Sequence, residues 1–133
     1  MSPDSRTSKP RMAVEVVRVY EDRRRRSGEH RVLVDRMWPR GVQRAALDID
    51  EWAKEVAPST ELRRWYSHDP GRFCEFASRY RAELDLDPGA AVVERLRAFA
   101  RGRGHLVVLT ATRDLGHSGA AVLAEVLAAS SGK

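Results

Sequence analysis

The amino-acid sequence predicts one domain of the α/β class. Two β-branched segments near the N-terminus, a middle region with the apolar spacing of helices, and a late apolar run before a last helical segment lead to this prediction. The length of 133 residues suits a single domain. We place it at residues 13–129, between a disordered leader at 1–12, rich in Ser, Pro and charge, and a disordered tail at 130–133.

Three strands are expected, at residues 14–20, 31–38 and 105–112. The third, HLVVLTAT, is continuously apolar, as in a strand covered on both faces. The chain between the second and third strands is long enough for a crossover, so these two strands are expected to be parallel. The loop of about nine residues between the first two is short for a crossover and suits a hairpin, which leaves the orientation of the first strand open.

Helices are expected wherever a capping residue precedes an apolar stripe. The first is predicted at 48–57, with Asp48 or Asp50 as its N-cap and its end before Pro58. Ser59 caps a short helix over 60–66. A longer helix follows at 70–84, with Asp69 as N-cap and a proline in its first position. Two further helices are expected, one starting after the Asp-Pro pair at 87–88 and one following the loop at 113–118.

Composition excludes several classes of protein. The single cysteine, Cys74, rules out an intramolecular disulfide and a multi-cysteine zinc site, which favours a reducing compartment. No apolar run reaches the roughly 20 residues of a membrane span, and no hydrophobic segment precedes Val14 as a secretory signal would require. We therefore expect a cytoplasmic protein without a membrane partner. The net charge of +5 permits an anionic partner.

Two loops are expected to share one rim of the sheet. Parallel strands end at the same edge, where open α/β sheets bind ligands. The segments WPRG at 38–41 and TATRDLGHSG at 110–119 would then face one crevice, and the second runs into a helix N-terminus that favours anions. The side chains expected to hold a small anionic ligand, with arginines as forked donors, belong to Arg36, Trp38, Arg40, Gly41, Thr110, Arg113 and Ser118.

The residues also carry a family resemblance. LVDRMWPRG, DEWAKEVAPSTELRRWYSHDP, FASRYRAEL and LTATRD with HSGAAVL resemble the YeaO-like branch of the family catalogued as domain of unknown function 488, over residues 14–127. The resemblance implies a compact three-layer α/β sandwich whose small, mostly parallel sheet is covered by helices, in a bacterial protein without an assigned activity. Family members often have Asn and then His or Gln where this chain has Ser118 and Gly119. The polar motif carries over to Asp35, Arg36, Trp38, Pro39, Arg40, Gly41, Ser59, Leu62, Arg63, Trp65, His68, Asp69, Pro70 and His117.

Three residues are candidates for catalysis. His117 or His68 would transfer a proton, oriented by Asp69 or Asp114, in a small hydrolase or transferase. A structural reading competes with each role: Asp69 as a helix cap, His117 as a residue that stabilises the helix end, and Trp38 as core packing. A ligand sensor without catalysis is the other reading of the crevice.

Other chemistry has less support. Ser118, His117 and Asp114 are too close in sequence for a catalytic triad, and Cys74 is expected to be a packed, inert thiol. The histidines lack metal-ligand spacing, so neither a metal nor a cofactor is expected. The run DRRRR at 22–26 suggests a nucleic-acid or protein-binding module as the alternative function, although a solvated loop is the usual explanation of such a run. The oligomeric state stays open.

Overall fold

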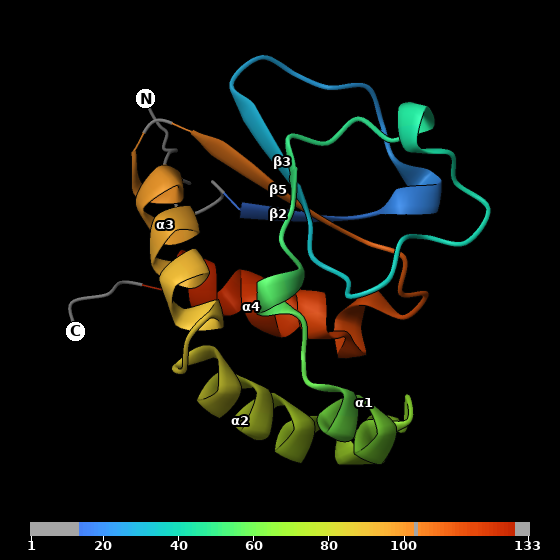
Figure 1. Ribbon diagram of the computed structural model, residues 1–133, viewed down its shortest axis with the longest axis vertical. Coiled ribbons are helices and arrows are strands. Elements are labelled where there is room, and N and C mark those ends of the chain that lie inside the picture. Colours follow the sequence, from blue (N-terminus) through green and yellow to red (C-terminus); the bar gives the residue numbers. More distant parts are fainter. Residues whose placement is uncertain (1–13, 103, 130–133) are drawn as a thin grey trace, which may run out of the picture.

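The computed structural model describes residues 14–102 and 104–129, so the expected leader at 1–12 and tail at 130–133 lie outside the described residues. One sheet contains β2 (Val14–Arg18), β3 (Glu29–Leu33), β4 (Glu51–Trp52) and β5 (His105–Thr110). Its strand order is β2-β5-β3-β4, and every neighbouring pair is parallel (Figure 1). The expected α/β class with a parallel sheet is confirmed, and the first strand is parallel to the others.

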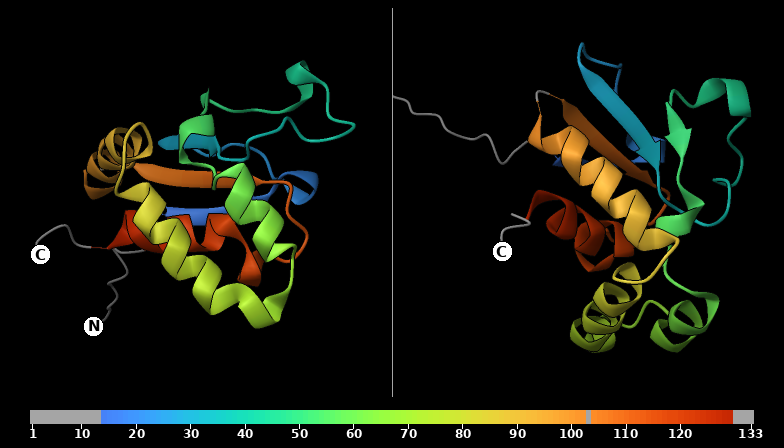
Figure 2. Two further views of the ribbon diagram at one scale, coloured as in Figure 1. Left: turned by 60° about the horizontal axis from the view of Figure 1, so that its bottom comes forward. Right: turned by 60° about the vertical axis from the view of Figure 1, so that its left-hand side comes forward.

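Helices cover one face of this sheet. They are α1 (Thr60–Tyr66), α2 (Phe73–Leu84), α3 (Gly89–Arg101) and α4 (Gly119–Ala128). α4 contacts β2 and β5, and α2 packs on α4 from the other side, so the layers follow one another from sheet to α4 to α2 (Figure 2). Among the described residues no helix combines the length and the apolar character needed to cross a membrane.

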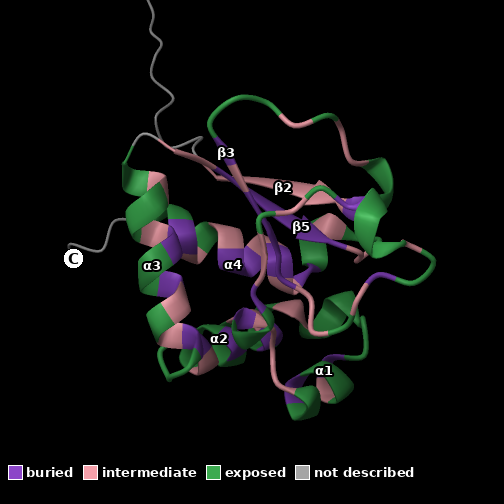
Figure 3. Cartoon of the chain, turned by 45° about the horizontal axis from the view of Figure 1, so that its top comes forward, coloured by how far each residue is buried: buried purple, intermediate pink, exposed green. Residues whose placement is uncertain are grey.

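The two faces of the sheet have different partners because side chains alternate along each strand. Val32, Leu106 and Val108 belong to the core under the helices, whereas Leu33 and Leu109 belong to a second core on the opposite face. That second face is covered by the loops after β2 and β3 instead of by helices. Figure 3 shows the central strands buried and the outer surfaces of the helices exposed. Burial on both faces explains the continuous apolar run that marked the third predicted strand.

The prediction of a helix at residues 48–57 is wrong. This segment forms the short edge strand β4 and a 3-10 turn at Lys54–Val56. The Asp50 and Ala53 N–H groups donate to carbonyl oxygens of β3 at 2.7 and 2.8 Å, and the indole N–H of Trp52 donates to the Asp35 carbonyl at 2.7 Å. These bonds to a distant strand outweigh the local helical pattern, because pairing along the sheet satisfies the same backbone groups.

The capping residues predicted for the helices after residue 59 are confirmed where the structure shows their hydrogen bonds. The Ser59 hydroxyl accepts from the Leu62 N–H at 3.1 Å, and the Asp69 carboxylate accepts from the Gly71 N–H at 3.0 Å. The proline after Asp69 opens a 3-10 turn, and α2 itself begins three residues later, at Phe73. The second strand is shorter than predicted: β3 ends at Leu33, so residues 35–38 lie beyond the sheet.

Candidate functional site

A cavity of about 130 Å³ lies where β3 and β5 end and α4 begins. The chain after each strand contributes to its wall, and so do α1, the residues that follow α1, and the aromatic face of α2. This is the edge that the parallel topology predicts for a ligand site. The wall consists of Val34, Asp35, Arg36, Ala57, Pro58, Arg63, Tyr66, His68, Phe76, Tyr80, Thr110, Thr112, His117, Ser118, Gly119 and Ala120.

The cavity brings together part of the predicted site. Arg36, Thr110, Ser118 and both candidate histidines line it. The other predicted residues are absent from its wall; they are Trp38, Arg40, Gly41, Asp69 and Arg113.

Their contacts explain what several of these outlying residues do instead. The Trp38 indole donates to the Val42 carbonyl at 2.6 Å, and its ring packs edge-on against Trp52. The Arg40 carbonyl accepts from the Tyr20 hydroxyl at 2.7 Å, and Gly41 supplies the positive φ of 80° that the turn requires. The WPRG segment therefore serves as a packed turn beside the cavity.

Asp35 is a buried carboxylate in the cavity wall that the predicted site omitted. Its Oδ1 accepts from the Thr110 hydroxyl and its Oδ2 from the Ala111 N–H, each at 2.7 Å. Burial raises the pKa of the Asp35 carboxyl, although these two hydrogen bonds and the nearby Arg63 guanidinium act in the opposite direction. The sequence holds a signal for both residues, because Asp35 and Arg63 belong to the family motif.

Arg36 has a donor without an acceptor. Its Nη2 donates to the Pro58 carbonyl at 3.1 Å, which fixes the side chain along the cavity wall. Its Nε is buried and has no hydrogen-bond partner among the described residues. A buried N–H without an acceptor costs stability, so this arginine is held in the wall against a penalty.

The start of α4 supplies two more donors. The Ser118 hydroxyl accepts from the Ala121 N–H at 3.1 Å and donates to the Leu115 carbonyl at 2.7 Å. Ser118 is thus the N-cap of α4, and both of its hydrogen-bonding roles are occupied within the protein. Gly119 and Ala120 line the cavity, and their N–H groups precede the first intrahelical bond.

His117 is held by two neighbours. Its Nδ1 lies 2.8 Å from Asp114 Oδ2, and its carbonyl accepts from the Tyr66 hydroxyl at 2.6 Å. The hydrogen bond from His117 lowers the pKa of the Asp114 carboxyl. With Nδ1 engaged, Nε2 is the nitrogen left to meet a ligand. His117 and His68 are both exposed, so they belong to the rim of the cavity.

The cysteine was predicted to be packed, and this prediction is wrong. Cys74 is exposed on α2. The buried face of this helix is made by Phe76, Tyr80 and Leu84, and position 74 points away from it. Cys74 also lies outside the cavity wall.

Ion pairs with carboxylates attach the arginine-rich loop at 22–26 to the sheet. Arg23 pairs with Glu15 and Glu29 at 2.8 and 2.7 Å, and Arg25 pairs with Asp48 and Asp50 at 2.7 and 3.0 Å. The loop connects the parallel strands β2 and β3, which lie on either side of β5, and these pairs hold it across the sheet. Two arginines of the run are therefore occupied in the fold, which weakens the nucleic-acid reading.

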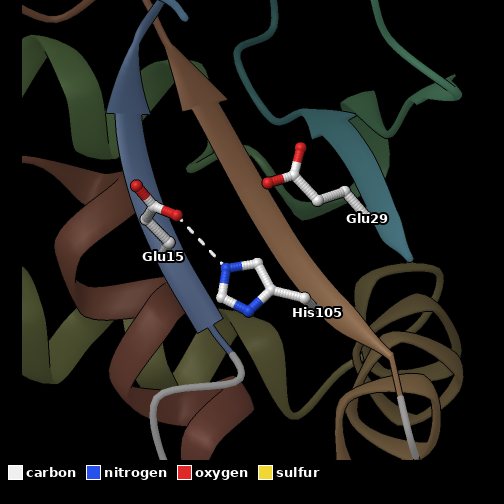
Figure 4. A group of neighbouring side chains, drawn as sticks. All are labelled: Glu15, Glu29 and His105. Carbon is white, nitrogen blue, oxygen red and sulfur yellow. Dashed lines mark hydrogen bonds and ion pairs between the residues drawn. The ribbon is translucent and has the colours of Figure 1, made fainter. Parts of the chain in front are cut away.

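A group with metal-ligand chemistry lies at the amino-terminal ends of the strands. Glu15, Glu29 and His105 come from β2, β3 and β5, and their ligand atoms all lie within 4.8 Å of one another (Figure 4). His105 Nε2 is 3.2 Å from Glu15 Oε1. The Arg23 guanidinium already bridges the two carboxylates, so a cation of the protein itself balances their charge. We assign this group to the structure of the sheet.

Comparisons with known proteins identify relatives without an assigned activity. A family model described as "Inactive DUF488-N3 subclade" matches residues 13–132. Uncharacterized proteins of Mycobacterium tuberculosis and Mycobacterium bovis are each 48% identical over 114 residues, 86% of this chain and 92% of each relative. The uncharacterized protein YeaO of Escherichia coli is 42% identical over 73 residues, 55% of this chain and 63% of YeaO. No solved structure matches the chain.

Proposed function

Since the chain belongs to the inactive DUF488-N3 subclade, we propose that its cavity binds a small anionic ligand without transforming it, as a ligand sensor does. The observation that carries the proposal is the set of donor-bearing residues in one wall. Arg36, Arg63 and the first residues of α4, Gly119 and Ala120, all line the cavity, and the N–H groups of Gly119 and Ala120 precede the first intrahelical bond. Carboxylate and phosphate oxygens are the acceptors that match such donors.

The electrostatics of the wall support an anion. The positive end of the α4 dipole and two guanidinium groups, those of Arg36 and Arg63, border the cavity. Asp35 is the single carboxylate among the lining residues, and burial raises its pKa. The region around the donors is therefore positive, and a ligand with one negative group is complementary to it.

The size of the cavity limits the ligand. A closed apolar cavity of about 150 Å³ accommodates the six carbon atoms of benzene, so about 130 Å³ suits a molecule of roughly five or six non-hydrogen atoms. A nucleotide or a strand of nucleic acid is larger than this space. A short-chain carboxylate or inorganic phosphate is the class of ligand that fits.

The positions of Ser118 and Cys74 support binding over covalent catalysis by either residue. Ser118 uses its hydroxyl to cap α4, and Cys74 is exposed outside the cavity wall. Neither is placed as a nucleophile beside a general base. The description of the subclade as inactive is in line with this arrangement.

Replacing Arg36 with methionine tests the proposal. We expect inorganic phosphate or a short carboxylate to stabilise the wild-type protein against thermal unfolding, by about 2.7 kcal/mol at a concentration one hundred times its Kd. The variant retains the length of the side chain but loses the charged donors, so its affinity should fall at least tenfold, about 1.4 kcal/mol or more. Isothermal titration calorimetry measures the affinity of both proteins for each anion.

Arg40→Met is the matched control. Arg40 also follows the second strand, but its side chain lies outside the cavity wall and its carbonyl makes the bond to Tyr20. The affinity of this variant should equal that of the wild type. If Arg40→Met weakens binding and Arg36→Met does not, or if no anion binds the wild type at millimolar concentration, the proposed site is wrong.

A further inference from the structure

Acceptors as well as donors line the cavity. The Asp35 carboxylate belongs to its wall, and so do the hydroxyl-bearing residues Thr110 and Thr112. Donor groups belong to Arg36 and to the first residues of α4, which line the same cavity. The cavity therefore has a donor side and an acceptor side within one small space.

Asp35 retains capacity to accept hydrogen bonds. Each of its oxygens receives one hydrogen bond from the protein, from Thr110 and from the N–H of Ala111. An ionised carboxylate has about four lone-pair sites, so roughly two remain. The Thr110 hydroxyl donates its single proton to Asp35. This hydrogen bond of 2.7 Å is shorter than the 3.2 Å between the Thr110 and Thr112 hydroxyl oxygens. The acceptor side is thus fixed in orientation by the protein before a ligand arrives.

The nearby arginines leave this capacity unused. Arg63 is near enough to lower the pKa of Asp35 through charge, but the described residues show no ion pair between the two side chains. Arg36 donates to the Pro58 carbonyl instead. A ligand that fills the cavity covers the lone pairs of Asp35 that the protein leaves free, and must itself supply a donor to them.

We propose that the ligand is a 2-hydroxy or 2-amino acid: a small carboxylate with a hydrogen-bond donor on the carbon next to the carboxyl group. The inference rests on the proposed function. The carboxylate of the ligand meets Arg36 and the start of α4, and its hydroxyl or amino group donates to Asp35. Both groups must belong to one compact molecule, because a cavity of about 130 Å³ has no room for a long spacer between them.

Three probes with the same carbon skeleton test the inference. Propionate, L-lactate and L-alanine differ only in the group at the second carbon, which is hydrogen, hydroxyl or ammonium. Calorimetric titration of the wild-type protein should give an affinity for L-lactate or L-alanine at least tenfold above that for propionate, since propionate leaves Asp35 without a donor. Tighter binding of L-lactate identifies a neutral donor, and tighter binding of L-alanine identifies a cation.

Asp35→Asn is the matching variant. It keeps the shape of the side chain but replaces one acceptor oxygen with a donor, so it should reduce the preference for L-lactate or L-alanine over propionate to less than threefold. Arg40→Met changes a side chain outside the cavity wall, and it should retain the preference. Circular dichroism checks that both variants fold, and the wild-type comparison stands without them.

The outcomes separate the two proposals. If the wild type binds propionate as tightly as L-lactate and L-alanine, or binds phosphate and none of the three, the hydroxy or amino acid is excluded while anion binding stands. If neither phosphate nor any of the three carboxylates binds, anion binding itself fails.

Discussion

Replacing Arg31 with methionine is expected to lower the free energy of unfolding by about 3–5 kcal/mol. Arg31 lies in the middle of β3 and is 0% exposed, which makes it the largest fully buried side chain described. Its Nη1 is 3.2 Å from Glu29 Oε1, its Nη2 bonds the Asp22 carboxylate, and its Nε donates to the Asp48 carbonyl at 2.7 Å. Removing the cation leaves carboxylates and a carbonyl without a partner in a site with little water.

The substitution should also weaken the attachment of the loop between β2 and β3 to the sheet. Asp22 belongs to the loop between β2 and β3, and Arg31 holds this loop over the second face of the sheet. The loop has no helix to bury an apolar stripe there, as most crossovers between parallel strands do. Its attachment depends instead on ion pairs, and Arg31 is the most deeply buried member of that network.

Urea unfolding monitored by circular dichroism measures the change. Arg81→Met is the control, because Arg81 forms an exposed pair with Glu125 of α4 and its loss should cost less than about 1 kcal/mol. The double variant Arg31→Met, Asp22→Asn removes one of the stranded charges and should recover about 1 kcal/mol. A loss below about 1 kcal/mol for Arg31→Met would contradict the role of the network.

Much of the helical structure could be predicted because its signals are local. Ser59, Asp69 and Ser118 each accept a hydrogen bond from a backbone N–H two or three residues further on, so the residue type and its position fix the cap. The edge strand β4 could not be predicted in the same way. Its backbone bonds run to β3, about twenty residues earlier, and its own sequence has the spacing of a helix.

The order of the strands depended on contacts between distant residues. The loop from β2 to β3 has the length of a hairpin, yet β5 lies between these strands and all three are parallel. What makes this connection stable is the set of pairs that Arg23, Arg25 and Arg31 make with acids on other segments. The run of arginines in the sequence gives no indication of these partners.

The sequence could predict which segments form the candidate site, because the topology of the sheet places their ends together. Because parallel strands end at one edge, Arg36 and Thr110 could be placed together with the start of the last helix, and the cavity wall contains them all. Which side chains turn inward depends on the path of each loop. Arg40 is only four residues beyond Arg36, but the turn at Gly41 directs this part of the chain away from the wall.

Acidification should destabilise the protein between about pH 4.5 and pH 2. Hydrogen bonds from Arg95 and His30 hold the pKa of Glu51 at about 2, against an ordinary value of 4.5. Burial acts to raise the pKa of Glu29, but hydrogen bonds from Arg23, the Arg26 N–H and Arg31 outweigh it and hold this pKa at about 2 as well. Both folded-state pKa values lie below the unfolded ones, so their contribution is complete above pH 4.5 and is lost as the pH falls through 2.

The expected size is about 3 kcal/mol for the two groups together. A shift of one pKa unit corresponds to 1.36 kcal/mol, and solvent screening reduces the contribution of the partly exposed Glu51. Asp35 acts in the opposite direction: its pKa is raised, so its stabilising contribution is present below its ordinary value of 3.8 and is lost as the pH rises through its folded-state pKa. Asp35 offsets only part of the stability lost on acidification, since its one raised pKa opposes the two lowered pKa values of Glu29 and Glu51.

Urea unfolding of Glu51→Gln at pH 7, 4.5, 3 and 2 isolates one of the groups. The variant should be less stable than the wild type at pH 7 and equal to it near pH 2, where the wild-type carboxylate is itself becoming protonated. Arg95→Met removes the guanidinium that lies 2.7 Å from Glu51, and should remove most of the same pH dependence from the other side of the pair. A gap between wild type and Glu51→Gln that stays constant from pH 4.5 to pH 2 would show that this ion pair does not hold the edge strand to α3.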